Sequence, residues 1–325
     1  MAAPDSVGPG AGGVSVIVPT RNRPGLLHAA LASVLRQTRP VDQIVVVDDA
    51  SDSTTELPAI AALCPSIEIC RRAQRGGVSA ARNDGIARAR GDYLFFLDDD
   101  DLIAPRFVEQ GLSVLDANRD ADGVFFRYRT IVSSEGQGDG DPFAGEPNPA
   151  RRSVLLGVEN PVPRATLERR AVTAFLRYLL PIHSGFLRRT AIGETRFLDS
   201  LCQGEDTHFW ISLAAAGRHF VLDEHDYAVI RRHAGNTTRS RLRYISEIQP
   251  CYQRLLSQGL LSEADDAFLA HLKLLWFKTL TGGKGAGPHF KHVLASPRLF
   301  AAELRFWTVN LATRLLSRPR STPTS

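Results

Sequence analysis

The stretch Tyr93-Leu94-Phe95-Phe96-Leu97-Asp98-Asp99-Asp100-Asp101 joins an apolar run to four consecutive aspartates. Such a run is typical of a buried strand, and in an open α/β sheet ligands bind outside the carboxyl ends of the strands. Adjacent carboxylates repel one another, so they persist most easily beside a cation or in open water. The stretch therefore predicts a divalent-metal site. The alternative is a solvated loop whose aspartates cap the helix that begins near Pro105.

Apolar runs alternate with helical patterns on both sides of this stretch. The expected strands are Val14–Val18, Gln43–Val47, Ile67–Cys70, the run before the aspartates and Gly123–Val132. The expected helices are Pro24–Gln37, one near 54–63, Val78–Ala89, Pro105–Ala117 and one from Glu205 through Ala216. This alternation predicts an α/β fold, Rossmann-like, with a mostly parallel sheet flanked by helices.

Length, charge and cysteine usage restrict the class of protein. A chain of 325 residues with 43% apolar residues can bury a full core. The net charge of +4 comes from plentiful charges of both signs, so it indicates no nucleic-acid partner, and anionic small molecules suffice. The four cysteines show no CxxC spacing, nothing at the N-terminus resembles a signal peptide, and we find no uncharged run of about 18 apolar residues. These features predict a cytoplasmic protein.

The composition divides the chain into three parts. Residues 1–13 are small and Gly/Pro-rich, which predicts a disordered tail. Residues 14–240 carry the α/β pattern, interrupted by a Gly/Pro-rich flexible insertion at Ser133–Ala150 and an arginine-rich segment up to Leu180. Residues 241–325 are predicted to form a helical extension with a disordered end, in which basic residues are interleaved with apolar ones. We favour packing of its apolar face on the main domain, and the alternative is peripheral contact with the inner face of a membrane.

Three further polar clusters follow predicted strands or open predicted helices. The turn Pro19-Thr20-Arg21-Asn22-Arg23 can receive an anion at the start of a helix, and Asp48-Asp49-Ala50-Ser51 offers carboxylates to base N–H or sugar hydroxyl groups. The glycine turn of Gly76–Asn83 starts a helix in which Arg82 could neutralise a phosphate or hold an aspartate of the metal cluster. Taken singly, each cluster is equally well an ordinary turn or cap.

An acidic pair, Glu205-Asp206, opens the last expected helix of the α/β region. Carboxylates are favoured at a helix N-terminus by the helix dipole, so capping is one interpretation. A carboxylate in such a place can also act as a general base.

In this order and spacing the clusters resemble glycosyltransferase family 2, a group with the GT-A fold. The resemblance lies on Val14–Arg23, Val47–Ser51, Gly77–Asn83 and Leu97–Asp101. It implies an inverting, metal-assisted transfer of a sugar from a nucleotide-diphosphate-sugar to a hydroxyl of a glycan, lipid-linked or other acceptor. Residues 14–132 would bind the donor, and residues 133–240 would hold the acceptor and the catalytic base.

The resemblance also implies roles for single residues. The donor would contact Pro19, Thr20, Arg21, Asn22, Asp49, Arg82, Asp98 and Asp99. The aspartates match the family's DXD motif, in which Asp100 would be the main ligand of Mg²⁺ or Mn²⁺, with Asp98 and His233 beside it. Asp206 would be the general base, supported by Glu205. His183 falls in a segment that lines the acceptor side in similar proteins.

Two other functions compete with this interpretation. A metal-dependent nucleotidyltransferase would also use aspartates and magnesium, but the glycine-rich, lysine-bearing phosphate loop expected of it is missing from the sequence. A catalytically silent binding scaffold with a GT-A-like fold is the other alternative. The intact Asp100 and Asp206 argue against it.

Overall fold

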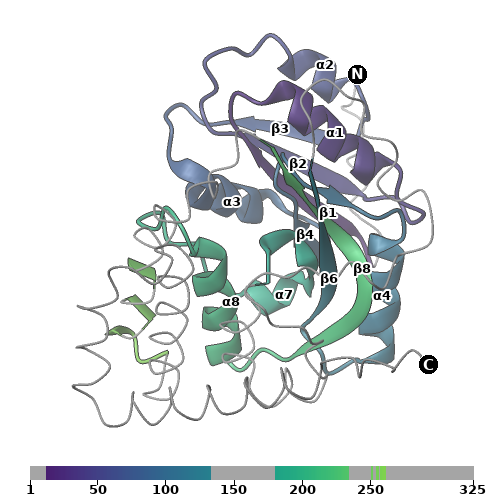
Figure 1. The fold of residues 1–325 in the computed structure, drawn as a ribbon, viewed down its shortest axis with the longest axis vertical. Coiled ribbons are helices and arrows are strands. Elements are labelled where there is room, and N and C mark those ends of the chain that lie inside the picture. The colour runs from purple at the N-terminus through teal and green to yellow at the C-terminus, as the bar shows by residue number, and fades with distance from the viewer. Residues whose placement is uncertain (1–11, 133–179, 234–249, 252–253, 256, 261–325) are drawn as a thin grey trace, which may run out of the picture.

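A computed structural model describes residues 12–132, 180–233, 250–251, 254–255 and 257–260 (Figure 1). The strands are β1 (Val14–Thr20), β2 (Gln43–Asp48), β3 (Ile67–Arg71), β4 (Tyr93–Phe96), β5 (Leu102–Ile103), β6 (Gly123–Val132), β7 (Gly185–Arg188) and β8 (Phe220–Arg232). The helices are α1 (Pro24–Leu35), α2 (Leu57–Ala61), α3 (Gly77–Arg88), α4 (Phe107–Ala117), α7 (Arg189–Ile192) and α8 (Glu205–Ala215), with a 3-10 turn, η1 (Ile182–Ser184).

The eight described strands form one sheet in the order β3-β2-β1-β4-β7-β6-β8-β5. Strands β1 to β4 pair in parallel, and so do β6 and β8, whereas β7 runs antiparallel to both β4 and β6. The short β5 is also antiparallel to its neighbour β8. The predicted α/β fold with a mostly parallel sheet is therefore confirmed, with antiparallel strands added in its second half.

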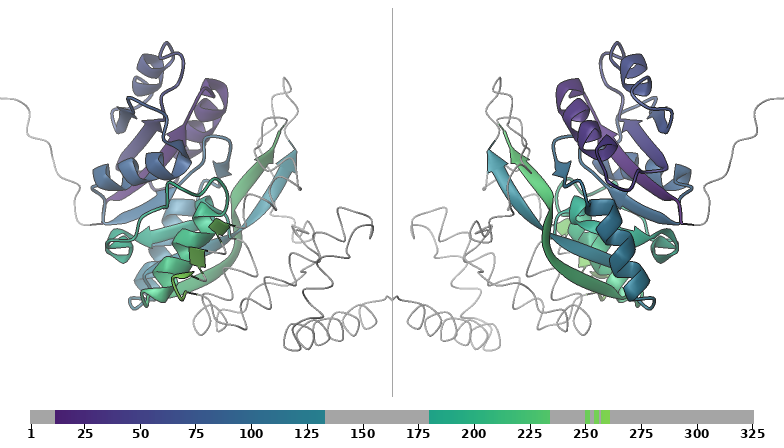
Figure 2. Two further views of the ribbon diagram at one scale, coloured as in Figure 1. Left: turned by 90° about the vertical axis from the view of Figure 1, so that its left-hand side faces the viewer. Right: turned by 90° about the vertical axis from the view of Figure 1, so that its right-hand side faces the viewer.

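Helices cover both faces of the sheet (Figure 2). Ile17 of β1 belongs to a core cluster with residues of α3 and α8, whereas its neighbours Val16 and Val18 belong to a second cluster with residues of α1 and α4. Successive side chains of a strand point to opposite faces, so a strand buried on both sides reads as a continuous apolar run. A side chain at Gly85 would collide with Ile17, which explains the glycine where α3 crosses β1.

Several predicted boundaries differ from the structure. Helix α2 is shorter than the predicted 54–63, and a backbone turn in which the Leu57 N–H donates to the Thr54 carbonyl oxygen precedes it. Strand β7 has four residues, too few for a pattern to stand out, and the two-residue β5 after the aspartates is likewise not predicted from the sequence.

The C-terminal residues that the structure describes contact the main domain. Cys251 and Leu255 are fully buried in the core cluster that contains α8, and Gln258 Oε1 lies 2.8 Å from His208 Nε2 of α8. This part of the predicted extension therefore packs on the domain. The predicted insertion at Ser133–Ala150, the arginine-rich segment that follows it and the helices after residue 260 lie outside the described residues. Within the described part, no helix is long and apolar enough to span a bilayer.

Candidate active site

The four aspartates form a tight connection between β4 and β5, which we call the aspartate loop (Asp98–Asp101). Asp99 and Asp101 are buried, and no side chain caps the start of helix α4, whose N-cap residue is Arg106. The alternative of a solvated loop that caps this helix is therefore wrong. A short antiparallel pairing of β5 with β8 instead holds the loop against the sheet.

Groups from β1 and from the turn after it contact the aspartate loop. Thr20 Oγ1 donates a 2.7 Å hydrogen bond to Asp99, and Arg23 Nη1 lies 3.2 Å from Asp99 Oδ1 and 3.0 Å from Asp100 Oδ2. Burial and the neighbouring carboxylate of Asp100 raise the pKa of Asp99 to about 6, although Arg23 opposes the shift. The positive charge of Arg23 is thus not enough to offset the burial of Asp99.

Two histidines face this loop from different elements. His233, after β8, places Nε2 at 3.2 Å from Asp100 Oδ2, and His183 of η1 places Nδ1 at 3.1 Å from Asp101 Oδ2. His183 is 1% exposed, and burial lowers its pKa to about 4. Its imidazole is therefore neutral at pH 7.

Arg82 of α3 connects the aspartate loop with the acidic pair of α8. Its guanidinium is buried, with Nη2 at 2.6 Å from Asp98 Oδ1 and Nη1 at 3.0 Å from Glu205 Oε1. The same group lies 5.2 Å from the centre of the Phe197 ring. Burial disfavours its charge, but the two carboxylates outweigh burial and raise the pKa of Arg82. Arg82 therefore holds two carboxylates that are far apart in the chain.

Asp206 lies in the first turn of α8, next to Glu205. Burial raises its pKa to about 7, the charge of Glu205 adds to the shift, and Arg82 and the backbone N–H of Thr207 oppose it. That N–H donates a 2.7 Å hydrogen bond to Asp206 Oδ1. A carboxylate with a pKa near neutrality can accept a proton from a bound hydroxyl group.

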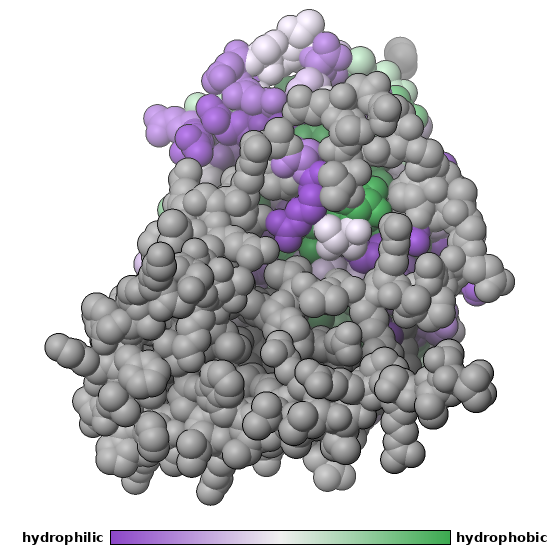
Figure 3. All heavy atoms as spheres, viewed as in Figure 1, coloured by the Kyte–Doolittle hydropathy of each residue, from purple (hydrophilic) through white to green (hydrophobic). Residues whose placement is uncertain are grey.

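The other residues predicted for the donor site lie at the ends of β1 and β2. Asp49 accepts hydrogen bonds of 2.7 and 2.8 Å from the N–H groups of Gly76 and Gly77. Asn22 donates to Asp52, and Arg21 Nη2 lies 3.5 Å from the same carboxylate. Pro19 is buried within β1. Hydrophilic residues gather on the surface over the nearby region of α2 and β3 (Figure 3).

The structure adds two arginines that the sequence does not predict for the site. Arg23 contacts two aspartates, and Arg231 donates its backbone N–H to Asp101 and its guanidinium N–H groups to the carbonyl oxygens of Asp99 and Asp100. Arg23 belongs to the polar turn after β1, and this position could have identified it from the sequence as a residue of the site. Arg231 gives no such signal, because only the pairing of β8 with β5 brings it to the loop.

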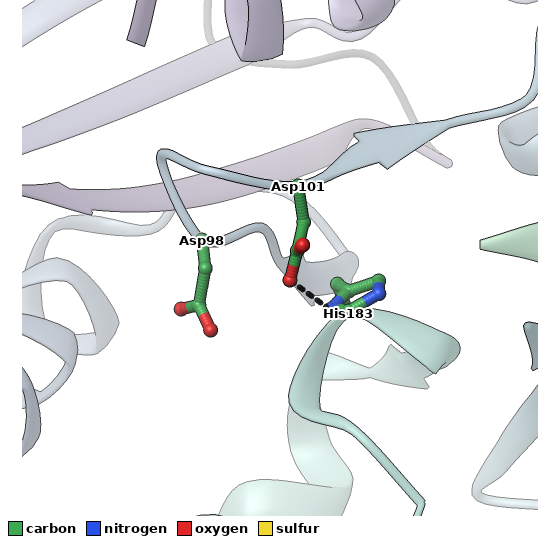
Figure 4. Close-up of side chains that lie close together, drawn as sticks. All are labelled: Asp98, Asp101 and His183. Atoms are coloured by element: carbon green, nitrogen blue, oxygen red, sulfur yellow. Dashed lines mark ion pairs between the residues drawn. The ribbon is translucent and has the colours of Figure 1, made fainter. Parts of the chain in front are cut away.

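The donor atoms of the site fit a divalent cation. Asp98, Asp101 and His183 each offer one atom, and these atoms lie within 4.8 Å of one another (Figure 4). Carboxylate oxygens suit Mg²⁺ and Mn²⁺, and a cation would offset the repulsion that raises the pKa of Asp99.

The raised pKa values predict how stability depends on pH. The pKa of Asp99 is about 6 and that of Asp206 about 7, and burial also raises the pKa of Asp101 above the usual 3.8. The folded state therefore holds protons that the unfolded state loses, so the metal-free protein should lose stability as the pH rises from about 4 to about 7. We expect Tm in EDTA to fall over this range, and Mn²⁺ to raise Tm more at pH 8 than at pH 5. A Tm that is flat with pH in EDTA would contradict the prediction.

Comparisons with known sequences indicate the family of the domain. Residues 15–162 match the sequence model of the family described as glycosyl transferase family 2. TarP of Staphylococcus aureus, a poly(ribitol-phosphate) beta-N-acetylglucosaminyltransferase, is 34% identical over 100 residues, which are 30% of this chain and 31% of TarP. The chain spans less than half the length of the curated relatives that it matches.

Solved structures share the fold. S. aureus TarS 1–349, in complex with UDP-GlcNAc, superposes with a TM-score of 0.60 at 19% identity, covering 89% of this chain and 81% of that chain. The mannosyltransferase PcManGT from Pyrobaculum calidifontis, in complex with GDP-Man and Mn²⁺, gives a TM-score of 0.59 at 19% identity, covering 92% and 80% of the two chains. Both likenesses place the chain in the GT-A fold.

Proposed function

Because this chain contains a glycosyltransferase family 2 domain of the GT-A fold, we propose that it is an inverting glycosyltransferase. It would move a sugar from a nucleotide-diphosphate-sugar to a hydroxyl group of a glycan or lipid-linked acceptor. TarS and PcManGT were solved with UDP-GlcNAc and GDP-Man, which supports this class of donor. The poly(ribitol-phosphate) in the name of TarP supports a polymeric acceptor that carries hydroxyl groups.

The single observation that carries the proposal is the bridge made by Arg82. It brings Asp98, in the expected donor site, and Glu205, next to the expected base, onto one guanidinium group. Asn83, the next residue of α3, exchanges two 2.9 Å hydrogen bonds with the backbone of Phe197, in the segment before α8. Helix α3 thus fixes the acidic end of α8 beside the aspartate loop, as a reaction between two bound substrates requires.

In the proposed reaction Asp206 accepts the proton of the acceptor hydroxyl while the oxygen attacks the anomeric carbon from the face opposite the diphosphate. The hydroxyl is too weak an acid to ionise first, so the base must lie within hydrogen-bond reach of it. The raised pKa of Asp206 suits a group that takes up a proton near pH 7. Glu205 helps to raise that pKa and is itself held by Arg82.

A divalent cation on the aspartate loop would neutralise charge on the diphosphate leaving group. The residues offer two ligand sets that share Asp98. The sequence predicts Asp98 with Asp100 and His233, and the contact between His233 and Asp100 supports this set. The other set is Asp98 with Asp101 and His183.

A titration of the full chain against UDP-, GDP- and dTDP-sugars tests the donor class. We expect one nucleotide family to bind when Mn²⁺ or Mg²⁺ is present and to bind much more weakly in EDTA, because the ion offsets repulsion between the diphosphate and the aspartates. Calorimetry measures both affinities, and the matching nucleoside monophosphate, with one phosphate fewer, is the control for diphosphate recognition. If no donor bound with either metal, the assignment would fail.

A further inference from the structure

The start of helix α8 carries the acidic pair but lacks the side-chain cap that usually fixes a helix start. Its N-cap residue is Gly204, which has a left-handed φ of 77° and offers no side chain to the N–H groups of the first turn. The N–H group that Asp206 accepts belongs to its own neighbour, Thr207, in the same turn. Contacts from other parts of the chain must therefore set where the first turn of α8 lies.

A segment far along the chain contacts α8 at this turn. We call the described residues between 250 and 260 the C-terminal segment. Cys251, Leu255 and Gln258 are spaced by four and three residues, which places them on one face of the segment where it is helical. Cys251 and Leu255 are fully buried, whereas Ser257 is exposed. The segment therefore turns one face toward the main domain.

Two polar contacts join the C-terminal segment to α8. The Cys251 thiol donates a 3.1 Å hydrogen bond to the carbonyl oxygen of Gly204, which also accepts the backbone N–H of His208 at 2.9 Å. Gln258 Oε1 lies 2.8 Å from Nε2 of the buried His208. Burial and the charges of the acidic pair raise the pKa of the Cys251 thiol, so it stays protonated and can donate. The segment thus holds both residues that the first backbone hydrogen bond of α8 joins.

Helix α8 is held from two sides. Asp206 and His208 are two positions apart, about 200° around a helix axis, so the base and the residue that Gln258 contacts lie on different sides of α8. Figure 1 shows the described pieces of the C-terminal segment beside α8, on the side away from the sheet. Arg82 of α3 binds Glu205 at the same turn. The position of the base relative to the aspartate loop therefore depends on the segment as well as on α3.

We propose that the C-terminal segment is a positioning element of the active site, in which Cys251 and Gln258 hold α8 so that Asp206 reaches the acceptor. This role rests on the proposed function, because it takes Asp206 as the general base. The segment lies outside residues 15–162, so the family match does not cover it. Cys251 and Gln258 act through α8 and not on a substrate. Their loss should therefore slow the reaction and spare donor binding.

Four variants of the full chain test the proposal. Cys251→Ala and Gln258→Met each remove one contact with α8, whereas Cys251→Ser keeps an O–H donor for the Gly204 carbonyl. Ser257→Ala is the matched control, because Ser257 is exposed and its hydroxyl donates to the carbonyl of Arg254 within the segment. Turnover is followed as release of nucleoside diphosphate from the nucleotide-sugar found by the donor titration, with water or poly(ribitol-phosphate) as the acceptor.

We expect kcat to fall about 10-fold in Cys251→Ala and less in Gln258→Met, within the 10²-fold loss that a misplacement of about 1 Å can cause. The Kd of the donor should stay nearly unchanged in both variants. Cys251→Ser should regain most of the lost kcat, and Ser257→Ala should keep the wild-type value. A fall in donor affinity equal to the fall in kcat would overturn the proposal, because the segment would then shape the donor site.

Hydrogen exchange gives a second readout that needs no substrate. Peptides that cover the first turn of α8 should exchange faster in Cys251→Ala and Gln258→Met than in the wild type. Helix α4 belongs to the other core cluster and should keep its wild-type exchange. Faster exchange in both helices would mean that the segment only stabilises the fold, which would overturn the proposed role.

The remaining outcomes separate this role from the proposed function. A wild type that binds and turns over a donor, with Cys251→Ala and Gln258→Met indistinguishable from Ser257→Ala, would overturn the role of the segment alone. If no nucleotide-sugar bound to the wild type, the proposed function would fail, and the role of the segment with it. If Cys251→Ala did not fold, Gln258→Met would still decide, because slower turnover with normal donor binding supports the role and normal turnover excludes it.

Discussion

Asp206→Asn is expected to lower kcat about 10³-fold, within the range that general acid–base catalysis contributes, and to leave the Kd of the donor nearly unchanged. Asparagine keeps the size and the acceptor oxygen that binds the Thr207 N–H, but it cannot take up a proton. A base acts on the acceptor, so donor binding should survive its loss. Steady-state rates and donor calorimetry on the same preparation measure the two effects separately.

Glu205→Gln is the matched control for this variant. Glutamine can still accept the hydrogen bond from Arg82, but it removes the negative charge that helps to raise the pKa of Asp206. The base should then ionise at lower pH, so the rising limb of kcat/KM against pH should move to lower pH while activity is retained. An Asp206→Asn enzyme with more than a tenth of wild-type kcat would place the base elsewhere. An equal loss of donor affinity would move Asp206 into the donor site.

Local patterns predict the first half of the fold well. Strand β6 runs over Gly123–Val132, as its apolar run indicates, and β1, β2, β4 and α3 lie within a few residues of their predicted bounds. Strands β1, β2 and β4 are buried almost throughout, and α3 buries one long face, so their signal lies within the segment itself. The four-residue β7 and the strand β8, which pair with β6, depend on contacts between distant segments.

Local sequence patterns also predict only part of the site. The aspartates and the acidic pair stand out in the sequence because each is a cluster of charges. Their connection does not, because Arg82 and Glu205 are 123 positions apart and meet only when α3 packs against the segment before α8. The burial of His183 is equally invisible, since η1 is a single turn whose environment is formed by the aspartate loop and by β4, β6 and β8.

Arg82→Met is expected to destabilise the fold by about 3–5 kcal/mol, the usual cost of removing one partner from a buried ion pair. Methionine fills much of the volume of the arginine stem, so the loss comes mainly from Asp98 and Glu205, which keep their charge without a cation. Urea denaturation measures the change in the free energy of unfolding. Arg88→Met on the same helix is the matched control, because Arg88 is exposed and such surface changes usually stay within about 0.5 kcal/mol.

The pH dependence separates lost charge pairing from lost packing in Arg82→Met. Acid protonates the two carboxylates that the variant leaves without a cation, so the deficit in unfolding free energy relative to the wild type should shrink as the pH falls. A packing defect would cost the same at every pH. Arg82→Lys keeps one positive charge but cannot contact both carboxylates with a planar guanidinium group. Its free energy of unfolding should therefore lie between those of the wild type and Arg82→Met. If Arg82→Met were as stable as Arg88→Met at pH 8, the bridge between the donor site and the base would contribute no stability, and α8 would have to be held in place by Asn83 and the core alone.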